Sequence, residues 1–146
     1  MPSKRKKKSN QFSYYGAACG GVTLLPNVVL ESKRYCPLTP QAKVVLNYIA
    51  SQYNGYNNGD LCATLSVFKK YQFNSNDTLT RALKQLESNG LIVRTRVGGK
   101  NWQTGGNLPS LYAVTWQPID ECKGKLDVEP TTKPPVNFLE ESRIIA

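Results

Sequence analysis

The chain has 146 residues, no histidine and a formal net charge of +9 at pH 7. This length fits one domain with tails, and the lack of histidine removes the commonest general base and the usual catalytic triads. The charge is uneven: residues 1–100 hold 15 Lys or Arg against 4 Asp or Glu (net +11), and residues 101–146 hold 4 against 6 (net −2). A positive field over the first part of the chain indicates a nucleic-acid partner.

A run of five basic residues lies close to the start, and we expect residues 1–12 to form a disordered arm because like charges repel. Such an arm lies along phosphates or in a minor groove beside a main DNA site. A solubilising tail is the alternative, and in a eukaryotic host the run would resemble a nuclear localisation signal. The residues expected to contact DNA from the arm are Lys4, Arg5, Lys6, Lys7 and Lys8.

The stretch between Lys8 and Glu31 is uncharged, so the chain begins with a basic segment and a neutral one, as a signal peptide does. However, Pro26, Asn27 and several glycines interrupt the neutral stretch. It lacks the continuous apolar run that a signal core or a membrane span needs. We therefore expect a cytoplasmic protein without a membrane partner.

The four cysteines, Cys19, Cys36, Cys62 and Cys122, are far apart and form no CxxC pair. Without histidine or close cysteine pairs, a structural zinc is not expected. Free thiols without a secretion signal favour a reducing compartment. No glycine-rich phosphate loop, nucleophile elbow or paired-carboxylate motif stands out, so we expect a protein that is not an enzyme and needs no cofactor or metal.

A helix is predicted over residues 40–53, with Thr39 as its N-terminal cap. The helix is apolar on two sides, and one side should pack on the domain core. The other side, which carries Val44 and Tyr48, needs a cover from residues 22–36 or from a second subunit. We favour residues 22–36, and hence a monomer in the absence of DNA, because cover within one chain is entropically easier.

Three short elements follow this helix. Residues 54–59 are rich in asparagine and glycine and predict a turn. Residues 61–62 are predicted as a short strand, and residues 64–71 as a helix with its apolar side chains facing inward. Residues 72–75 then form the turn of a helix-turn-helix.

The most informative segment begins with a predicted helix over residues 76–89. Ser75 or Asn74 caps its start, Asp77 suits the positive end of the helix dipole, and Gly90 suits the stop position. Leucines at i, i+4 and i+7 form an apolar stripe. The opposite face is polar, and the basic strand and loop that follow favour DNA contact over a merely solvated face. The residues expected to contact DNA from this helix are Ser75, Asn76, Thr78, Thr80, Arg81 and Lys84.

Two runs rich in β-branched residues, 91–97 and 111–116, are predicted as strands joined by a long glycine-rich loop. A hairpin loop of this length usually has a function or is mobile, and a wing over about residues 94–110 is the natural function here. Trp102 is either a DNA contact or a core residue folded back under the loop, and both interpretations stay open. The residues expected to contact DNA from the wing are Arg94, Arg96, Lys100 and Trp102.

Residues 123–146 form a tail with fewer aromatic residues and several prolines, so we expect it to be extended or flexible. Two short apolar pairs, 138–139 and 144–145, lie near its end. They either fray in solvent, which we favour, or dock as a short peptide on a partner protein or on the domain itself.

Together these elements predict an α+β fold, a winged helix-turn-helix over residues 22–122 with a three-helix core and a two- or three-stranded β wing. A flexible basic arm and a flexible tail flank it. A helix presented in this way enters the major groove of DNA, so we expect a protein that binds double-stranded DNA, as a homodimer on its site. The alternative is a winged-helix protein-interaction or structural module that does not read DNA. RNA binding is a weaker hypothesis, because the chain lacks the paired aromatic strands of an RNA-recognition sheet.

Several longer motifs add to this prediction. They are LxSxxYxxLTPQA (30–42), QYNGYNNGDL (52–61), NSNDTLTRALKQLESNGLI (74–92), TRVGG (95–99) and SLYAVTWQPIDEC (110–122). With the basic start, they resemble the motifs of small winged helix-turn-helix proteins from bacterial phages, plasmids and integrated elements, over about residues 22–128. The resemblance implies a transcriptional regulator or replication accessory of a mobile element in a bacterial host, and it carries over no catalytic residues.

Overall fold

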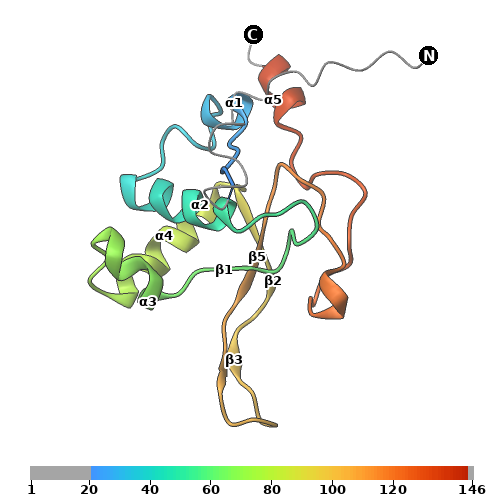
Figure 1. Ribbon diagram of the computed structural model, residues 1–146. Coiled ribbons are helices and arrows are strands. Elements are labelled where there is room, and N and C mark those ends of the chain that lie inside the picture. Colours follow the sequence, from blue (N-terminus) through green and yellow to red (C-terminus); the bar gives the residue numbers. More distant parts are fainter. Residues whose placement is uncertain (1–20, 145–146) are drawn as a thin grey trace, which may run out of the picture.

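The computed structural model describes residues 21–144, which form a mixed α+β structure (Figure 1). The α+β class expected from the sequence is confirmed, and the basic arm at residues 1–12 lies outside the described residues. The helices are α1 (Asn27–Leu30), α2 (Pro40–Ser51), α3 (Leu65–Phe68), α4 (Asn76–Ser88) and α5 (Phe138–Ile144), with short 3-10 turns η2 (Lys69–Tyr71) and η3 (Cys122–Gly124). The strands are β1 (Leu61–Cys62), β2 (Ile92–Arg96), β3 (Gly99–Lys100), β4 (Asn107–Leu108) and β5 (Leu111–Val114).

Three strands of the described residues form one antiparallel sheet in the order β1-β5-β2. The central strand β5 pairs Tyr112 with Leu61 on one side and Val114 with Ile92 on the other. Every residue of β5 is buried, as expected for a central strand in a folded core. Strands β3 and β4 pair with each other as a separate ribbon, which in Figure 1 projects beyond the sheet and away from α1 and α2.

Helices α2 and α4 pack against each other and, with the sheet, form the core. Leu46 of α2 and Leu86 of α4 are fully buried, and burying each such side chain contributes about 1.5–3 kcal/mol. Thr39 caps α2 as predicted, because its hydroxyl accepts a hydrogen bond from the Ala42 amide at 3.3 Å.

Helix α4 follows the sequence-based prediction closely. The Ser75 hydroxyl accepts from the Thr78 amide at 3.3 Å and so caps the helix. Leu79 and Leu86 are buried along one side. Gly90 follows the helix with a φ of +70°, a left-handed conformation that favours glycine, as expected for the stop position.

The second apolar side of α2 is covered in part by the same chain. The ring of Tyr48 lies edge-on to that of Phe68, with 5.0 Å between ring centroids. Leu25 and Val44 are half-buried and line the same hollow as Tyr48. Cover by residues 22–36, which the sequence analysis favours, is therefore present around Leu25.

The tail differs from the sequence-based expectation. Phe138 of α5 is 4% exposed and belongs to the core, and the Val136 amide donates to the Thr115 carbonyl at 3.1 Å. Arg34 donates through Nε to both carboxylate oxygens of Glu141, at 3.0 and 2.9 Å. The expected fraying is therefore wrong for this part of the tail, since a buried ring and an ion pair hold α5 on the domain.

Candidate nucleic-acid interface

The outer face of α4 is polar and open to solvent. Because the buried side chains of α4 are turned to the core, Asn76, Thr80, Arg81 and Lys84 stand on the exposed side, as the sequence predicts. Two other residues that were predicted to contact DNA are engaged within the fold. The Ser75 hydroxyl caps the helix and Thr78 is half-buried, so these two residues offer less to a ligand.

Arg81 forms an ion pair with Asp77 one helical turn earlier, with 3.0 Å between Nη2 and Oδ2. Both side chains are about three-quarters exposed, at 72% and 76%. An exposed pair of this spacing is worth only about 0.3–0.5 kcal/mol. The guanidinium of Arg81 is therefore held loosely and remains available to a stronger acceptor such as a phosphate or a guanine edge.

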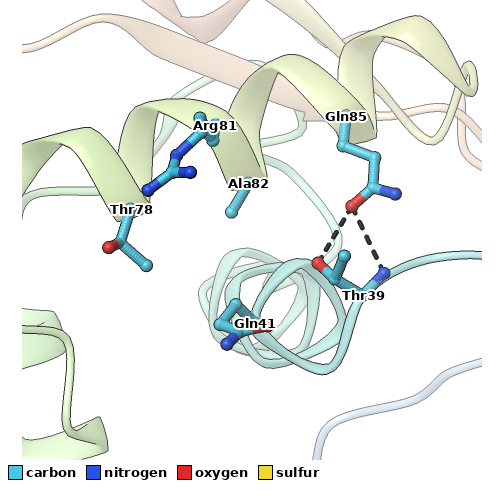
Figure 2. A pocket seen from close by; sticks show the side chains of 6 residues that line it. All are labelled: Thr39, Gln41, Thr78, Arg81, Ala82 and Gln85. Atoms are coloured by element: carbon cyan, nitrogen blue, oxygen red, sulfur yellow. Dashed lines mark hydrogen bonds between the residues drawn. The ribbon is translucent and has the colours of Figure 1, made fainter.

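A first hollow of about 400 Å³ lies between α4 and the first turn of α2 (Figure 2). In Figure 2, Thr78, Arg81 and Gln85 lie along the side of α4 that borders this turn. The Gln85 Oε1 accepts from the Thr39 amide and hydroxyl at 3.3 and 3.0 Å. Gln85 therefore fixes α4 to the start of α2, whereas Arg81 carries the charge at the rim.

A second hollow of about 400 Å³ lies on the other side of α4. Its walls come from the start of α3, from α4 and from the base of the β2–β5 hairpin. The hollow brings Asn76, Thr80 and Lys84 of α4 together with Arg94 of β2 and Ser110 before β5. Four residues that the sequence analysis places in two separate predicted elements thus share one groove.

Two arginines of β2 contact other groups of the protein. Arg94 donates through Nε to Glu87 at 3.1 Å, and its guanidinium lies 5.9 Å from the centre of the Tyr112 ring. Burial raises the pKa of Tyr112, so its phenol is neutral at physiological pH. Arg96 donates to the Pro109 carbonyl at 3.1 Å, and its Nε is the one buried side-chain nitrogen or oxygen of the described residues without a hydrogen-bond partner. Arg94 therefore lines the groove while it is paired with Glu87, and Arg96 is engaged by a backbone carbonyl.

The ribbon beyond the base is more exposed. Lys100 is open to solvent, and Trp102 at the ribbon tip is 89% exposed. The interpretation of Trp102 as a core residue is therefore wrong. Trp102 lies in the turn between β3 and β4, and this ribbon projects beyond the three-stranded sheet (Figure 1).

Two further lysines border this surface, and the sequence analysis missed them. Lys69 and Lys70 of η2 are exposed, directly before the turn that leads into α4. Two adjacent lysines ahead of a predicted recognition helix are the signal that would have identified them. With them, residues 61–110 hold seven Lys or Arg against two acidic residues, a net charge of +5.

Within residues 21–144 no group of three or more His, Cys, Asp or Glu side chains is placed to hold a metal ion. In the same residues no helix combines the length and the apolar content needed to cross a bilayer. Comparison of the chain with protein-family models, curated proteins and solved structures gave no match.

Proposed function

We propose that this chain is a winged helix-turn-helix protein that binds double-stranded DNA. In this proposal α3 and α4 are the helix-turn-helix, α4 is the recognition helix and the β2–β5 hairpin is the wing. The order α2, β1, α3, α4, β2, β5 with an extended hairpin between the last two strands supports it. The single observation that carries it is the exposed polar face of α4, which stands between two hollows and in a segment of net charge +5.

The chemistry of this face matches base edges in the major groove. The major groove, about 12 Å wide, admits one α-helix. Arg81 and Lys84 are of the residue types that donate to the O6 and N7 atoms of guanine, and Asn76 is of the type that pairs with adenine. The wing base and Lys69 and Lys70 supply positive charge for the phosphates on either side.

The biological role that we propose is regulation of transcription or assistance to replication on a mobile element, in the cytoplasm of a bacterial host. The motifs quoted above support this role. The protein acts as a binding protein and not as an enzyme in this proposal. A homodimer on a two-fold symmetric DNA site fits the same proposal, because protein symmetry is then mirrored in the site.

Selection of bound sequences from random duplex DNA, with the full chain, tests the proposal. We expect one enriched motif. Lys84→Ala and Arg81→Ala should each reduce the preference for that motif over random DNA by about 5- to 150-fold, because a base contact is worth about 1–3 kcal/mol. Lys133→Ala is the matched control, since Lys133 is an exposed lysine of the tail. Absence of any enriched motif, or the same loss in all three variants, would contradict sequence-specific binding by α4.

A further inference from the structure

The tip of the β3–β4 ribbon presents an aromatic side chain to solvent. Trp102, with 89% of its surface exposed, is the most exposed of the large hydrophobic side chains in the described residues. A single exposed apolar side chain needs no explanation by itself. Three further observations indicate a ligand for Trp102: the hydrogen-bonded turn that carries it, the polar residues beside it and the position of the ribbon next to α4.

The turn that carries Trp102 is closed by hydrogen bonds. The Asn101 amide donates to the Gly106 carbonyl at 2.7 Å, and the Gly105 amide donates to the Asn101 carbonyl at 2.8 Å. The Asn101 Oδ1 accepts from the Gln103 amide at 3.0 Å. Gly105 has a φ of +74°, which allows the tight reversal. The backbone around the indole is therefore preorganised, which lowers the entropic cost of binding.

The neighbours of Trp102 are suited to a nucleobase and not to a protein surface. Lys100 is the one charged residue between Val97 and Ser110, and the tip is otherwise built of amide, hydroxyl and glycine residues. A protein interface of ordinary size buries about 800 Å² on each partner, and residues 101–106 hold no large apolar side chain besides Trp102 to build one. An aromatic face beside amide groups provides stacking and edge hydrogen bonds, which is how unpaired bases are recognised.

The ribbon starts beside the proposed recognition helix. The Gly98 amide donates to the Ser110 hydroxyl at 2.9 Å, and Ser110 lines the hollow shared with Lys84 of α4. From Gly98 to Trp102 the chain advances at most about 13 Å, roughly four base-pair steps. A duplex held by α4 therefore has its next few base pairs within reach of the indole.

We propose that Trp102 stacks on an unpaired nucleobase beside the duplex held by α4, so that the preferred ligand is DNA with a junction between duplex and single strand. This inference rests on the proposed function. Stacking of one base on an aromatic side chain raises affinity about 5- to 150-fold, which is about 1–3 kcal/mol at 1.4 kcal/mol per tenfold. Inside an intact duplex the same contact requires unstacking of a base step, whose cost is of similar size and cancels the gain.

Fluorescence anisotropy with the full chain tests the proposal on three labelled DNAs. The first is a blunt duplex of about 20 base pairs, or two helical turns. The second carries in addition an overhang of about six thymidines, enough for one binding patch, and is made with each polarity. The third has the same overhang with abasic sites, which keeps the phosphates and removes the bases. We expect the thymidine overhang of one polarity to bind at least about fivefold tighter than the blunt duplex and the abasic overhang.

Substitutions distinguish the contribution of the Trp102 indole from that of any exposed aromatic side chain. Trp102→Ala should abolish the preference for the overhang and leave binding of the blunt duplex unchanged, and Trp102→Phe should retain part of the preference. Tyr56→Ala is the matched control, because Tyr56 is 86% exposed in the turn between α2 and β1. It should keep the full preference.

A direct readout comes from fluorescence of the indole itself. The chain has two tryptophans, and Trp116 is half-buried against the core. In a Trp116→Phe background Trp102 is the one tryptophan, and excitation at the red edge of the indole absorption avoids the tyrosines. Stacking should quench this emission on the thymidine overhang and leave it unchanged on the blunt duplex and on the abasic overhang.

The outcomes distinguish this inference from the proposed function. Failure to bind any of the DNAs would overturn both. Blunt-duplex binding without an overhang preference, or an equal gain from the abasic overhang, would overturn the stacking role of Trp102 and leave duplex binding intact. Weaker binding of Trp102→Ala to the blunt duplex would show that the indole inserts between base pairs of intact DNA. A parent protein that is an oligomer in light scattering and loses this mass in Trp102→Ala would show that Trp102 contacts protein. Either result overturns the inference.

Discussion

Asn58 illustrates how much one buried side chain organises in this chain. It is fully buried in the turn between α2 and β1. Its Nδ2 donates to the carbonyls of Val114, Gln117 and Pro118, and its Oδ1 accepts from the Val114 amide at 2.8 Å. Its own amide donates to Asp120 at 2.8 Å. The turn is thereby tied to the end of the central strand β5 and to the segment after it.

We predict that Asn58→Ala lowers the free energy of unfolding by about 2–4 kcal/mol. The change removes the four side-chain hydrogen bonds and leaves the Val114 amide buried without a partner, and each such unsatisfied group costs about 1–3 kcal/mol. Urea unfolding followed by circular dichroism measures it. Asn47→Ala on the exposed surface of α2 is the control and should stay within about 0.5 kcal/mol of the parent. Equal effects from the two variants would show that the Asn58 cluster contributes little.

Asp77 is the second residue whose role follows from its position. Its carboxylate stands on the exposed face of α4 and pairs with Arg81. Near DNA the same carboxylate meets phosphates of like charge. We predict that Asp77→Asn raises affinity for random duplex DNA by about threefold at low salt, because it removes this repulsion and releases Arg81 from a weak pair. Anisotropy titrations measure it, with Glu31→Gln as the control. Unchanged or weaker binding would mean that α4 does not face the phosphates.

At the scale of elements, the helices and the central sheet are largely predictable because their signals are local. The cap Ser75 and the stop Gly90 lie next to α4, and the leucine spacing fixes its buried side. The docking of α5 could not be predicted in this way. It depends on Arg34, which is 107 positions away from Glu141 in the sequence, and no local pattern encodes that contact.

In the candidate site, too, features with a local sequence signal were predictable and features that depend on tertiary contacts were not. The outward positions of Arg81 and Lys84 follow from helical periodicity and were predicted. The hydrogen bond from Arg96 to the Pro109 carbonyl was not, because the register of the β2–β5 pairing shifts between Arg94 and Arg96 and no local sequence pattern gives that shift. The exposure of Trp102 also depends on the geometry of a particular turn, and composition alone leaves it open.

The contact between α5 and the domain predicts a dependence on pH. Hydrogen bonds from Arg34 hold the pKa of Glu141 below its ordinary value of 4.5. Arg34 also donates to the Asn89 carbonyl at the end of α4, so the ion pair links α5 to α4. Since the folded pKa is the lower one, the pair stabilises the fold fully above about pH 4.5 and loses this contribution as the pH falls through the folded pKa.

We therefore predict that hydrogen exchange of the α5 amides speeds up, relative to the rest of the protein, between about pH 6 and about pH 3, after correction for intrinsic rates. Each side chain is about one-third exposed, at 35% and 36%, so the stabilisation amounts to about 1 kcal/mol or less. Glu141→Gln is the control, because it removes the titrating group and should exchange faster at both pH values. A parent protein whose α5 protection is independent of pH would contradict the role of this pair.

At the scale of the whole molecule, positive charge prevails in residues 1–110 and negative charge in the residues after them. Residues 61–110, which carry the proposed interface, have a net charge of +5, whereas residues 111–144 hold six acidic residues against four basic ones. Lys125 of that second region pairs with Asp60, with 3.0 Å between Nζ and Oδ2, so the charges of these two side chains offset each other within the protein. In the proposed function, the positive charge of the first 110 residues orients the molecule on a polyanion before any base is read.

Under the proposed function, this distribution predicts a steep dependence of DNA binding on salt. With roughly 6–10 phosphate contacts, counterion release should lower affinity on the order of a thousandfold or more between 50 and 200 mM salt.

The five basic residues at positions 4–8 should contribute to the slope of this salt dependence without contributing to sequence preference. Deleting residues 1–8 should therefore reduce the slope and weaken binding to the selected motif and to random DNA alike, whereas Lys84→Ala should mainly weaken binding to the motif. Anisotropy titrations at several salt concentrations measure both slopes. A flat response in the parent protein would remove the electrostatic basis of the proposed function, and a deletion that weakens the motif alone would assign the arm to base reading instead.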